Sequence, residues 1–465
     1  MADVPSSVVI LGLARQGAAL ARFFAARGAE VTISDIRPAD KLEAAMAALE
    51  EEGLSLRYVL GEHPPELLDD CDLLCLSGGI PLDLPIVAAA RARGISLSND
   101  AQEFVARCPA PIVGITGSAG KTTTTTLVGK MLEAEGFTTW VGGNIGNPLL
   151  NELLNIDPDD RVVMELSSFQ LDLMSVSPEV AGVLNITPNH LDRHKTMAAY
   201  VAAKRNIVAH QGPEDVAVLG YDEPNARALA ASTPAAVRYF SGADVAEADV
   251  FLRDDTLMLR RSEGADLVEV CARESIQLRG SHNVLNVLAA IALADAVGAS
   301  VGAMREAIGA FTGVAHRLEV VRRWCDALWV NDSIATAPER VIAALDAFDE
   351  PIILLAGGRD KDLEWEALAR RIVERVRILI TFGEVGPLIR EHVLRAWVQA
   401  QQEGVPVTLM ESVPVGPLLA AVQAATARAR PGEVVLLSPG GTSFDAFTDF
   451  AERGEYFRAL VEDFR

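Results

Sequence analysis

The stretch that decides the fold is PIVGITGSAGKTTTTTLVGKML, residues 111–132. Its first residues are a short Ile/Val run that predicts a buried strand, and Gly120, Lys121 and Thr122 then open an apolar-periodic segment that predicts a helix. A glycine-containing turn between strand and helix brings backbone N–H groups and a helix N-terminus together, which favours phosphate binding. The common pattern G-x-x-x-x-G-K-[ST] would place its first glycine where this chain has Ile115. We therefore predict a phosphate-binding loop whose first turn differs from that pattern.

Length and composition indicate a globular protein of about three domains. The chain has 465 residues, half of them apolar and evenly spread, and a net charge of -23. Because phosphate backbones require a basic surface, this charge argues against a nucleic-acid partner. The most hydrophobic N-terminal stretch, residues 8–28, contains Arg15 and Arg22 and suits neither a signal peptide nor a membrane span. We expect a cytoplasmic protein without membrane insertion. The five cysteines form no C-x-x-C pair and predict neither a zinc site nor a disulfide framework.

The order of strand-like and helix-like segments predicts an α/β fold with mainly parallel sheets. Three blocks are expected, with boundaries at 1–108, 109–313 and 314–465, the first ending at the proline-containing sequence CPAP. In four places a strand-like run leads into a glycine turn, where a helix N-terminus would favour anions. These transitions are residues 8–17, 111–122, 351–361 and 434–447.

The first block carries an incomplete dinucleotide fingerprint. Gly12 and Gly17 are present and Asp35 follows about twenty residues later, but Ala14 replaces the middle glycine. NAD binding is therefore disfavoured, while a Rossmann-like domain that uses the same cleft for another nucleotide fits the pattern. The glycine turn at 76–80, LSGGI, lies in the same block.

The central block contains three candidate catalytic or metal-binding side chains. Glu165 follows a strand and should emerge beside the Lys121 loop, where phosphate-binding proteins place the acid that holds Mg²⁺; the alternative is a solvated strand end. His190 ends another strand, in LNITPNHLDRH, where a helix-capping turn is the alternative. Lys204 lies in an otherwise apolar helix, where it could be a surface lysine that snorkels.

Eight motifs occur in the order found in the Mur ligases of peptidoglycan synthesis, and the chain resembles that family over essentially its whole length. They are GITGSAGKTTTT, GGNIGNPLL, ELSSFQLD, NITPNHLDRH followed by AAK, GSHNVLNVLAA, HRLE, NDSIAT and SPGGTSFDAF. The sequences SSFQLD, NDSIAT and SPGGTSFDAF favour the family member that adds D-glutamate.

The resemblance implies a Rossmann-like N-terminal domain for the UDP-sugar, a P-loop-type central ATPase and a Rossmann-like C-terminal domain for the amino acid. It further implies that ATP phosphorylates the alanine carboxylate of UDP-N-acetylmuramoyl-L-alanine and that D-glutamate attacks the acyl phosphate. This is a cytoplasmic step in the synthesis of the cell wall, on which cell shape and division depend. A monomer is expected, with these three small molecules as its partners.

Residue roles follow from the matching motif positions. The resemblance assigns ATP binding to Gly117, Ser118, Gly120, Lys121, Thr122, Thr123, Asn283, Asn286, His316, Arg317 and Asp332. It assigns two Mg²⁺ sites to Thr122, Glu165, His190 and Lys204, and catalytic roles to Lys121, Asn144, His190 and Lys204. Lys204 corresponds to a carbamylated lysine, a modification that turns a cation into an anion able to bind a hard metal.

Substrate positions follow in the same way. The UDP-sugar is assigned to Asp35, Ser77, Gly78 and Gly79, its reacting carboxylate to Asn144, and D-glutamate to Thr336, Lys361, Ser443, Phe444 and Phe450. A helix N-terminus expected at GGTSFD would receive the second carboxylate of D-glutamate. Two positions depart from the family: Ile334 replaces a lysine found in some members, and Gly78 replaces a frequent proline.

Four other functions stay open at this point. They are a ligase for another amino acid, a folylpolyglutamate synthetase-like enzyme, a regulatory or scaffold protein that kept the loop without turnover, and, least favoured, an NAD oxidoreductase.

Overall fold

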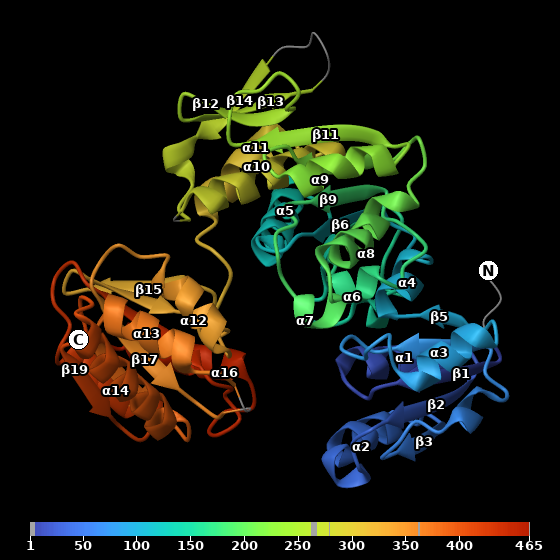
Figure 1. Ribbon diagram of the computed structural model, residues 1–465. Coiled ribbons are helices and arrows are strands. Elements are labelled where there is room, and N and C mark those ends of the chain that lie inside the picture. Colours follow the sequence, from blue (N-terminus) through green and yellow to red (C-terminus); the bar gives the residue numbers. More distant parts are fainter. Residues whose placement is uncertain (1–4, 262–266, 279, 361–362, 465) are drawn as a thin grey trace. The chain divides into compact units, whose positions relative to one another are not determined.

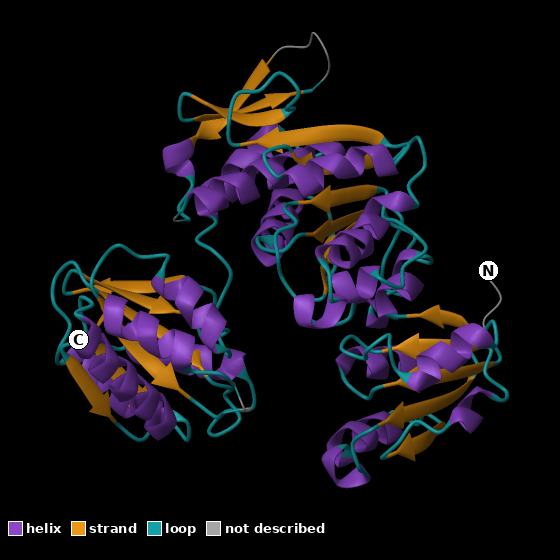
Figure 2. Cartoon of the chain, in the orientation of Figure 1, coloured by secondary structure: helices purple, strands orange, loops and turns teal. Residues whose placement is uncertain are grey.

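The computed structural model describes residues 5–261, 267–278, 280–360 and 363–464 and contains three β-sheets (Figures 1 and 2). The chain forms two compact units. The first comprises Met1–Gln277 with Ser281–Phe311, and the second Leu278–Gly280 with Thr312–Arg465.

The N-terminal sheet of the first unit has five parallel strands in the order β3-β2-β1-β4-β5. Its elements are β1 Ser7–Leu11, α1 Arg15–Ala25, β2 Glu30–Asp35, η1 Ala39–Lys41, α2 Glu43–Glu51, β3 Leu56–Leu60, η2 Pro65–Leu68, β4 Leu73–Leu76, α3 Pro85–Ala92, β5 Ser96–Ser98 and α4 Asp100–Val105. Gly12 turns the chain after β1 with φ +90°, and a Cβ on Gly17 would lie 2.0 Å from the Gly12 carbonyl oxygen. The two glycines of the fingerprint are therefore needed to pack α1 against the β1 turn.

The central sheet has nine strands in the order β14-β13-β12-β11-β10-β9-β6-β8-β7. Its strands are β6 Ile112–Thr116, β7 Thr139–Gly143, β8 Arg161–Glu165, β9 Val180–Val183, β10 Val216–Gly220, β11 Ala236–Ser241, β12 Val250–Arg253, β13 Thr256–Arg260 and β14 Leu267–Ala272. Its helices are α5 Lys121–Glu135, η3 Leu149–Asn151, α6 Ser168–Leu171, α7 Leu191–His194, α8 Met197–Ala209, α9 Pro224–Ala228, η4 Leu229–Ser232, η5 Arg273–Ser275, α10 Ser281–Ala296 and α11 Val301–Ala310. The sheet is parallel from β7 to β12 and ends in the antiparallel strands β13 and β14.

The second unit contains a six-stranded sheet in the order β15-β16-β20-β17-β18-β19, parallel except for β15. Its elements are β15 Glu319–Trp324, β16 Ala327–Asn331, α12 Pro338–Leu345, β17 Ile352–Gly357, α13 Glu366–Arg375, β18 Val376–Phe382, α14 Gly386–Glu403, β19 Glu411–Pro414, α15 Leu418–Thr426, β20 Val434–Gly440 and α16 Phe450–Glu462. Successive residues of β17 enter different cores, because side chains alternate across a strand. Leu354 packs in the core that includes Leu368 of α13, and Leu355 in the core that includes Phe457 of α16.

The predicted α/β fold with mainly parallel sheets is confirmed, but the helix expected at GGTSFD is wrong. Helices follow closely after β1 and β6, whereas the next helices after β17 and β20 begin only at Glu366 and Phe450. Residues after β20 instead form turns and an isolated bridge between Arg359 and Thr442. The first turn of α16 is capped by the chain's own Asp449, which accepts the N–H of Glu452 at 2.8 Å.

Two further sequence expectations can be compared with the described residues. Cys71 and Cys75 are buried and are not in a disulfide. Within the described ranges, no helix combines the length and apolar character that a bilayer crossing requires.

Candidate active site

The turn of the phosphate loop begins later than in the common pattern, because Ile115, which occupies the position of the first glycine, belongs to a strand. Ile115 is fully buried in β6 and pairs with Glu165 of β8 on one side and Gly182 of β9 on the other. The turn therefore consists of residues 117–120, and α5 starts at Lys121. Gly120 caps α5 with φ +84°, and a Cβ there would lie 2.1 Å from Asn286 Oδ1. An isoleucine at 115 is thus compatible with the loop, whereas Gly120 has no room for a side chain.

Glu165 is the centre of a polar cluster beside this loop. The Thr122 hydroxyl donates to Glu165 Oε2 at 2.8 Å, and the Asn144 side-chain amide donates to Oε1 at 2.8 Å. The Asn144 backbone N–H also donates to the Glu165 carbonyl at 2.8 Å. Glu165 is 2% exposed, so the interpretation as a solvated strand end is wrong. Its oxygens and the Thr122 hydroxyl form a hard donor set, the kind that Mg²⁺ uses together with substrate phosphates.

Two lysines meet at the same carbonyl of the loop. Lys121 Nζ donates to the Gly117 carbonyl at 2.9 Å, and Lys204 Nζ donates to it at 3.0 Å and to Thr116 Oγ1 at 3.0 Å. Lys204 is 1% exposed, so the snorkelling interpretation is wrong. Burial, followed by repulsion from Lys121, lowers the pKa of Lys204 well below its usual value, while Glu165 opposes the shift. The site therefore favours a neutral amine at Lys204.

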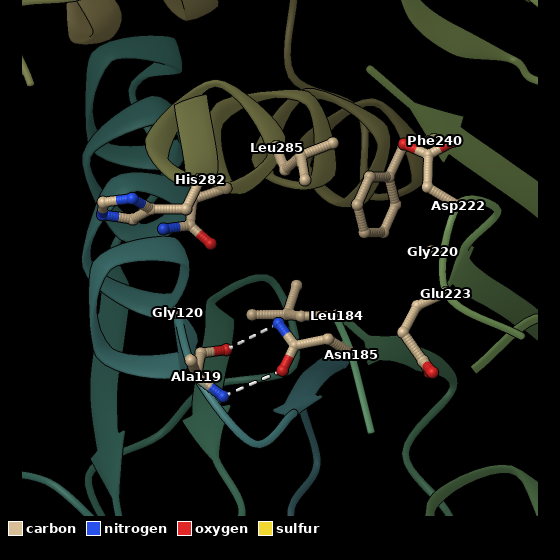
Figure 3. A pocket seen from close by; sticks show the side chains of 11 residues that line it. Ala119, Gly120, Leu184, Asn185, Gly220, Asp222, Glu223, Phe240, His282 and Leu285 are labelled. Carbon is tan, nitrogen blue, oxygen red and sulfur yellow. Dashed lines mark hydrogen bonds between the residues drawn. The ribbon is translucent and has the colours of Figure 1, made fainter. Parts of the chain in front are cut away.

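A pocket of about 330 Å³ opens beside the N-terminus of α5 (Figure 3). Asn185 closes its floor, since its side chain exchanges hydrogen bonds with the Ala119 N–H at 2.9 Å and carbonyl at 3.1 Å. Asn286 lines the pocket and donates to Asn283 Oδ1 at 2.9 Å, so the two predicted asparagines lie together. Sequence reasoning missed other lining residues, namely Leu184, Asn185, Asp222, Glu223, Phe240, His282 and Leu285. Leu184 and Asn185 lie in LNITPNHLDRH, and His282 and Leu285 lie in GSHNVLNVLAA, so these motifs could have pointed to them. Asp222, Glu223 and Phe240 carry no motif signal.

His190 lies in a strained turn directly before α7. It is exposed, adopts a left-handed conformation with φ 52°, and its ring contacts Phe169 edge-on at 5.2 Å between centroids. Its backbone N–H donates to Asn189 Oδ1 at 2.9 Å. Positive φ at a histidine is uncommon and costs free energy, which fits a functional position.

The predicted UDP-sugar positions lie at the carboxyl ends of β2 and β4. Asp35 accepts a hydrogen bond from the Leu13 N–H at 2.8 Å and forms an ion pair with Arg37 at 2.7 Å. Burial alone would raise its pKa, but the hydrogen bonds from Arg37 and Leu13 lower it to about 2. The Gly78 N–H donates to Gln16 Oε1 at 2.7 Å. A proline there would lack this donor, which explains the glycine. Ser77 is buried and Gly79 has φ +134°.

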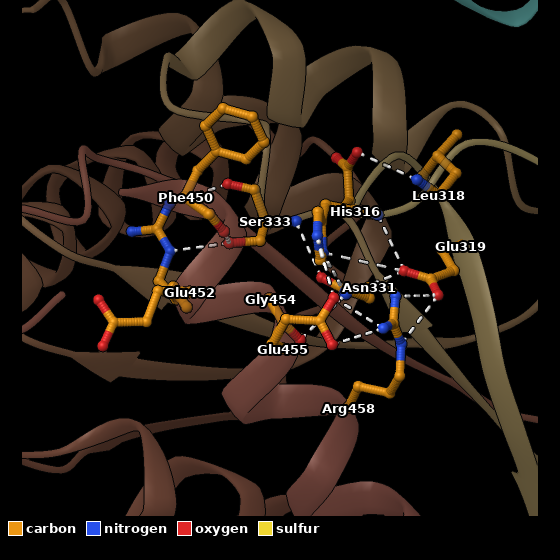
Figure 4. A network of polar contacts seen from close by, with 12 residues as sticks. His316, Leu318, Glu319, Asn331, Ser333, Phe450, Glu452, Gly454, Glu455 and Arg458 are labelled. Carbon is orange, nitrogen blue, oxygen red and sulfur yellow. Dashed lines mark hydrogen bonds and ion pairs between the residues drawn. The ribbon is translucent and has the colours of Figure 1, made fainter. Parts of the chain in front are cut away.

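In the second unit, His316 and Asp332 are buried in a polar network (Figure 4). Asn331 Nδ2 lies 3.1 Å from His316 Nδ1, and Glu455 Oε1 lies 3.4 Å from its Nε2. Burial lowers the pKa of His316, although the nearby carboxylates of Glu319 and Glu455 act to raise it. Asp332 accepts from the Ser438 hydroxyl at 2.8 Å, and burial raises its pKa to about 7 despite this bond. Arg317 follows His316 in the chain and forms an isolated β-bridge with Val314.

The predicted D-glutamate positions lie on the loops after β16 and β20. Thr336 is half-buried, Ser443 is buried, Phe444 is 60% exposed and Phe450 begins α16. Lys361 lies outside the described residues. Ile334, which replaces a lysine found in some family members, donates its backbone N–H to the His316 carbonyl at 3.1 Å.

Comparison with known proteins identifies the family. Three family models match: "Mur ligase MurD-like, N-terminal domain" over residues 6–99, "Mur ligase middle domain" over 115–294 and "Mur ligase, glutamate ligase domain" over 316–441. The chain is 43% identical over 455 residues to the UDP-N-acetylmuramoylalanine–D-glutamate ligase of Symbiobacterium thermophilum, covering 97% of each protein. The chain belongs to the Mur ligase family.

Similarity to other Mur ligases supports this family membership. The enzyme of the same name from Roseiflexus sp. is 40% identical over 468 residues, covering 98% of each protein. Among solved structures, UDP-N-acetylmuramate-alanine ligase of Thermotoga maritima aligns with a TM-score of 0.57 and 18% identity over 98% of this chain and 99% of its own. That structural likeness shows the shared Mur ligase fold. Membership in the Mur ligase family, shown by the family models and the 43% identical relative, argues against an NAD oxidoreductase.

Proposed function

We propose that this Mur ligase joins D-glutamate to UDP-N-acetylmuramoyl-L-alanine at the expense of ATP, through an acyl phosphate. The observation that carries the proposal is the cluster of Thr122, Glu165 and Asn144 beside the buried Lys204, all at one phosphate loop. Full-length relatives at 43% and 40% identity bear the name of that enzyme, which supports D-glutamate as the amino acid.

ATP binding is proposed at the phosphate loop and the adjoining pocket. Gly117, Ser118, Gly120, Lys121, Thr122 and Thr123 would hold the phosphates at the N-terminus of α5, where the helix dipole favours anions. The pocket combines the Phe240 ring and Leu285 with the Asn286 amide, a lining suited to a flat base with polar edges. Asn283 would orient Asn286 through their 2.9 Å bond. We assign His316, Arg317 and Asp332 to the ribose and phosphate part of the site.

Magnesium would be held by Glu165 and Thr122, whose oxygens already lie 2.8 Å apart. When bound, Mg²⁺ neutralises charge on the phosphates during phosphoryl transfer. We assign a second Mg²⁺ to His190 and Lys204, and we propose that Lys204 is carbamylated. A neutral amine is the form that reacts with carbon dioxide, and the resulting anion would be attracted by the Lys121 ammonium.

The chain's own groups then have defined tasks in the reaction. Lys121 would stabilise the negative charge of the phosphoryl group while that group is transferred from ATP to the alanine carboxylate. Asn144, fixed by Glu165, would orient the carboxylate. The D-glutamate amine attacks the acyl carbon, the carbon–oxygen bond to phosphate breaks, and the amine loses a proton as the amide forms. This reaction requires an amine that is neutral when it attacks.

The remaining assignments concern the other substrates and the domains. We assign the UDP-sugar to Asp35, Ser77, Gly78 and Gly79, and D-glutamate to Thr336, Lys361, Ser443, Phe444 and Phe450. We propose domains at 1–108, 109–313 and 314–465, supported by three sheets and three family models that each lie within one range. A cytoplasmic monomer remains our proposal for the cellular form.

Oxygen transfer tests the acyl phosphate directly. The alanine carboxylate of UDP-N-acetylmuramoyl-L-alanine is labelled with ¹⁸O, and the released phosphate is analysed by mass spectrometry after turnover with ATP and D-glutamate. The proposal predicts one labelled oxygen in each phosphate, because the carboxylate oxygen leaves with the phosphoryl group. Unlabelled phosphate, or phosphate released without both substrates, contradicts it and supports a protein that kept the loop without ligation.

A further inference from the structure

Arg453 of α16 is a cation with no exposed surface in the second unit. It is 0% exposed and ranks among the largest fully buried side chains of the described residues. Its Nε donates to Ser333 Oγ at 3.0 Å and its Nη2 to the Ser333 carbonyl at 2.9 Å. Its Nη1 donates to the carbonyls of Gly441 at 3.2 Å and Thr442 at 3.1 Å. Guanidinium is suited to such a role because its donors form a rigid planar fork.

These hydrogen bonds join the loops that follow two adjacent strands. Ser333 follows β16, Gly441 and Thr442 follow β20, and β20 lies between β16 and β17 in the sheet. Gly358, directly after β17, is also close, since a Cβ there would lie 2.9 Å from Arg453 Nη1. Carboxyl-end loops of this kind are where open α/β sheets bind ligands. The same loops carry the proposed D-glutamate positions Thr336 and Ser443.

The charge of Arg453 has only neutral direct partners among the described residues. Its acceptors are peptide carbonyls and one hydroxyl, and no carboxylate of the described chain lies within 4.0 Å of it. Burial lowers its pKa to about 10, with Asp445 acting in the opposite direction, so the side chain stays protonated at neutral pH. A buried cation without a carboxylate partner is costly, and an anionic ligand on the loops above it would offset that cost.

We propose that Arg453 is a specificity-determining positioning residue for the dicarboxylate amino acid. It holds the loops after β16 and β20 together and supplies positive charge that favours an amino acid with an anionic side chain over one with a neutral side chain. The inference rests on the proposed function and adds a positive charge to the proposed D-glutamate site. Such a charge is needed there because Ile334 replaces a lysine found in some family members and because no helix begins at GGTSFD. Electrostatic attraction of this kind acts through the low-dielectric interior without direct contact.

Selectivity between D-glutamate and its neutral isostere D-glutamine tests the inference. Arg453→Met is expected to raise the KM for D-glutamate about tenfold, equivalent to ~1.4 kcal/mol, and to reduce the preference for D-glutamate over D-glutamine by a similar factor. The KM for the UDP-sugar should stay within about twofold, because its site is assigned to the N-terminal block. Where D-glutamine is not turned over, its inhibition constant against D-glutamate replaces the KM.

Two further variants separate charge from loop packing. Arg453→Lys keeps the charge and should keep most of the selectivity, even if thermal stability and kcat fall with the lost fork. Ser333→Ala removes one acceptor of Arg453 and the 2.7 Å bond that Ser333 Oγ donates to the Phe450 carbonyl, and it should leave selectivity unchanged because the charge of Arg453 remains. If Arg453→Met and Arg453→Lys lower activity with both amino acids equally, or if selectivity is unchanged in a folded Arg453→Met protein, the inference is overturned. Failure of the wild-type protein to ligate D-glutamate would instead contradict the proposed function.

Discussion

Lys204 illustrates how burial changes the chemistry of a single side chain. Its amine lies at 1% exposure between Thr116 and the Gly117 carbonyl, beside the ammonium of Lys121. Both desolvation and this neighbour disfavour protonation, so its pKa is lowered well below the usual value. The Lys121 ammonium would attract an anion at this position, and bound Mg²⁺ would offset the cost of burying its charge, which is the physical basis for proposing a carbamate there.

Removal of the amine tests this role. Lys204→Ala should lower kcat at least about a hundredfold, because charge stabilisation in the reacting site is lost. A short carboxylic acid such as acetate should restore part of the activity by occupying the position of the carbamate. Lys130→Ala is a matched control, since Lys130 is an exposed lysine of α5 that pairs with Glu133. Wild-type activity in Lys204→Ala would contradict the role.

At the level of elements, tight contacts between a helix and the preceding turn decide which glycines are required. Gly17 of α1 is in contact with the Gly12 carbonyl, whereas Gly309 of α11 has no atom within 4 Å of an added Cβ. Both glycines are helical, but only the first is part of the turn that shapes a proposed ligand site. The two glycines of the incomplete fingerprint therefore differ from Gly309 in being required for packing.

A pair of glycine substitutions tests this packing. Gly17→Ala should lower the free energy of unfolding by about 1–3 kcal/mol, because the added methyl group overpacks against the Gly12 carbonyl. Gly309→Ala should leave it unchanged or raise it by up to ~1 kcal/mol through better helix propensity. Urea unfolding followed by circular dichroism measures both. Equal stability of the two variants would show that the contact at Gly17 is not required.

The elements also show what the sequence could predict. The β6 strand, the α5 helix and the closeness of Glu165 to Thr122 were predictable, because local periodicity and strand ends determine them. The turn after β20 was not, since the glycine signal at GGTSFD marks a bridge to Arg359 as readily as a helix start. The burial of Lys204 was hidden as well, because α8 is apolar around much of its circumference.

At the scale of the whole molecule, strand order assembles the proposed site. β6 lies between β8 and β9, and β7 lies beyond β8. The phosphate loop after β6 therefore meets Glu165 of β8, Asn144 after β7 and Asn185 after β9 at one sheet edge. Parallel pairing places all these carboxyl ends together. A single sequence gives the strands but not their order, which is why the place of Phe240 in the pocket could not be predicted from it.

The most direct test of the central claim is phosphate release with the two enantiomers of glutamate. Purified protein is supplied with ATP, Mg²⁺ and UDP-N-acetylmuramoyl-L-alanine, and D-glutamate or L-glutamate is added. We predict phosphate release with D-glutamate in equal amount to a new amide product, and only background release with L-glutamate. Equal release with L-glutamate, or release that does not depend on any amino acid, would contradict the assignment as a D-glutamate ligase.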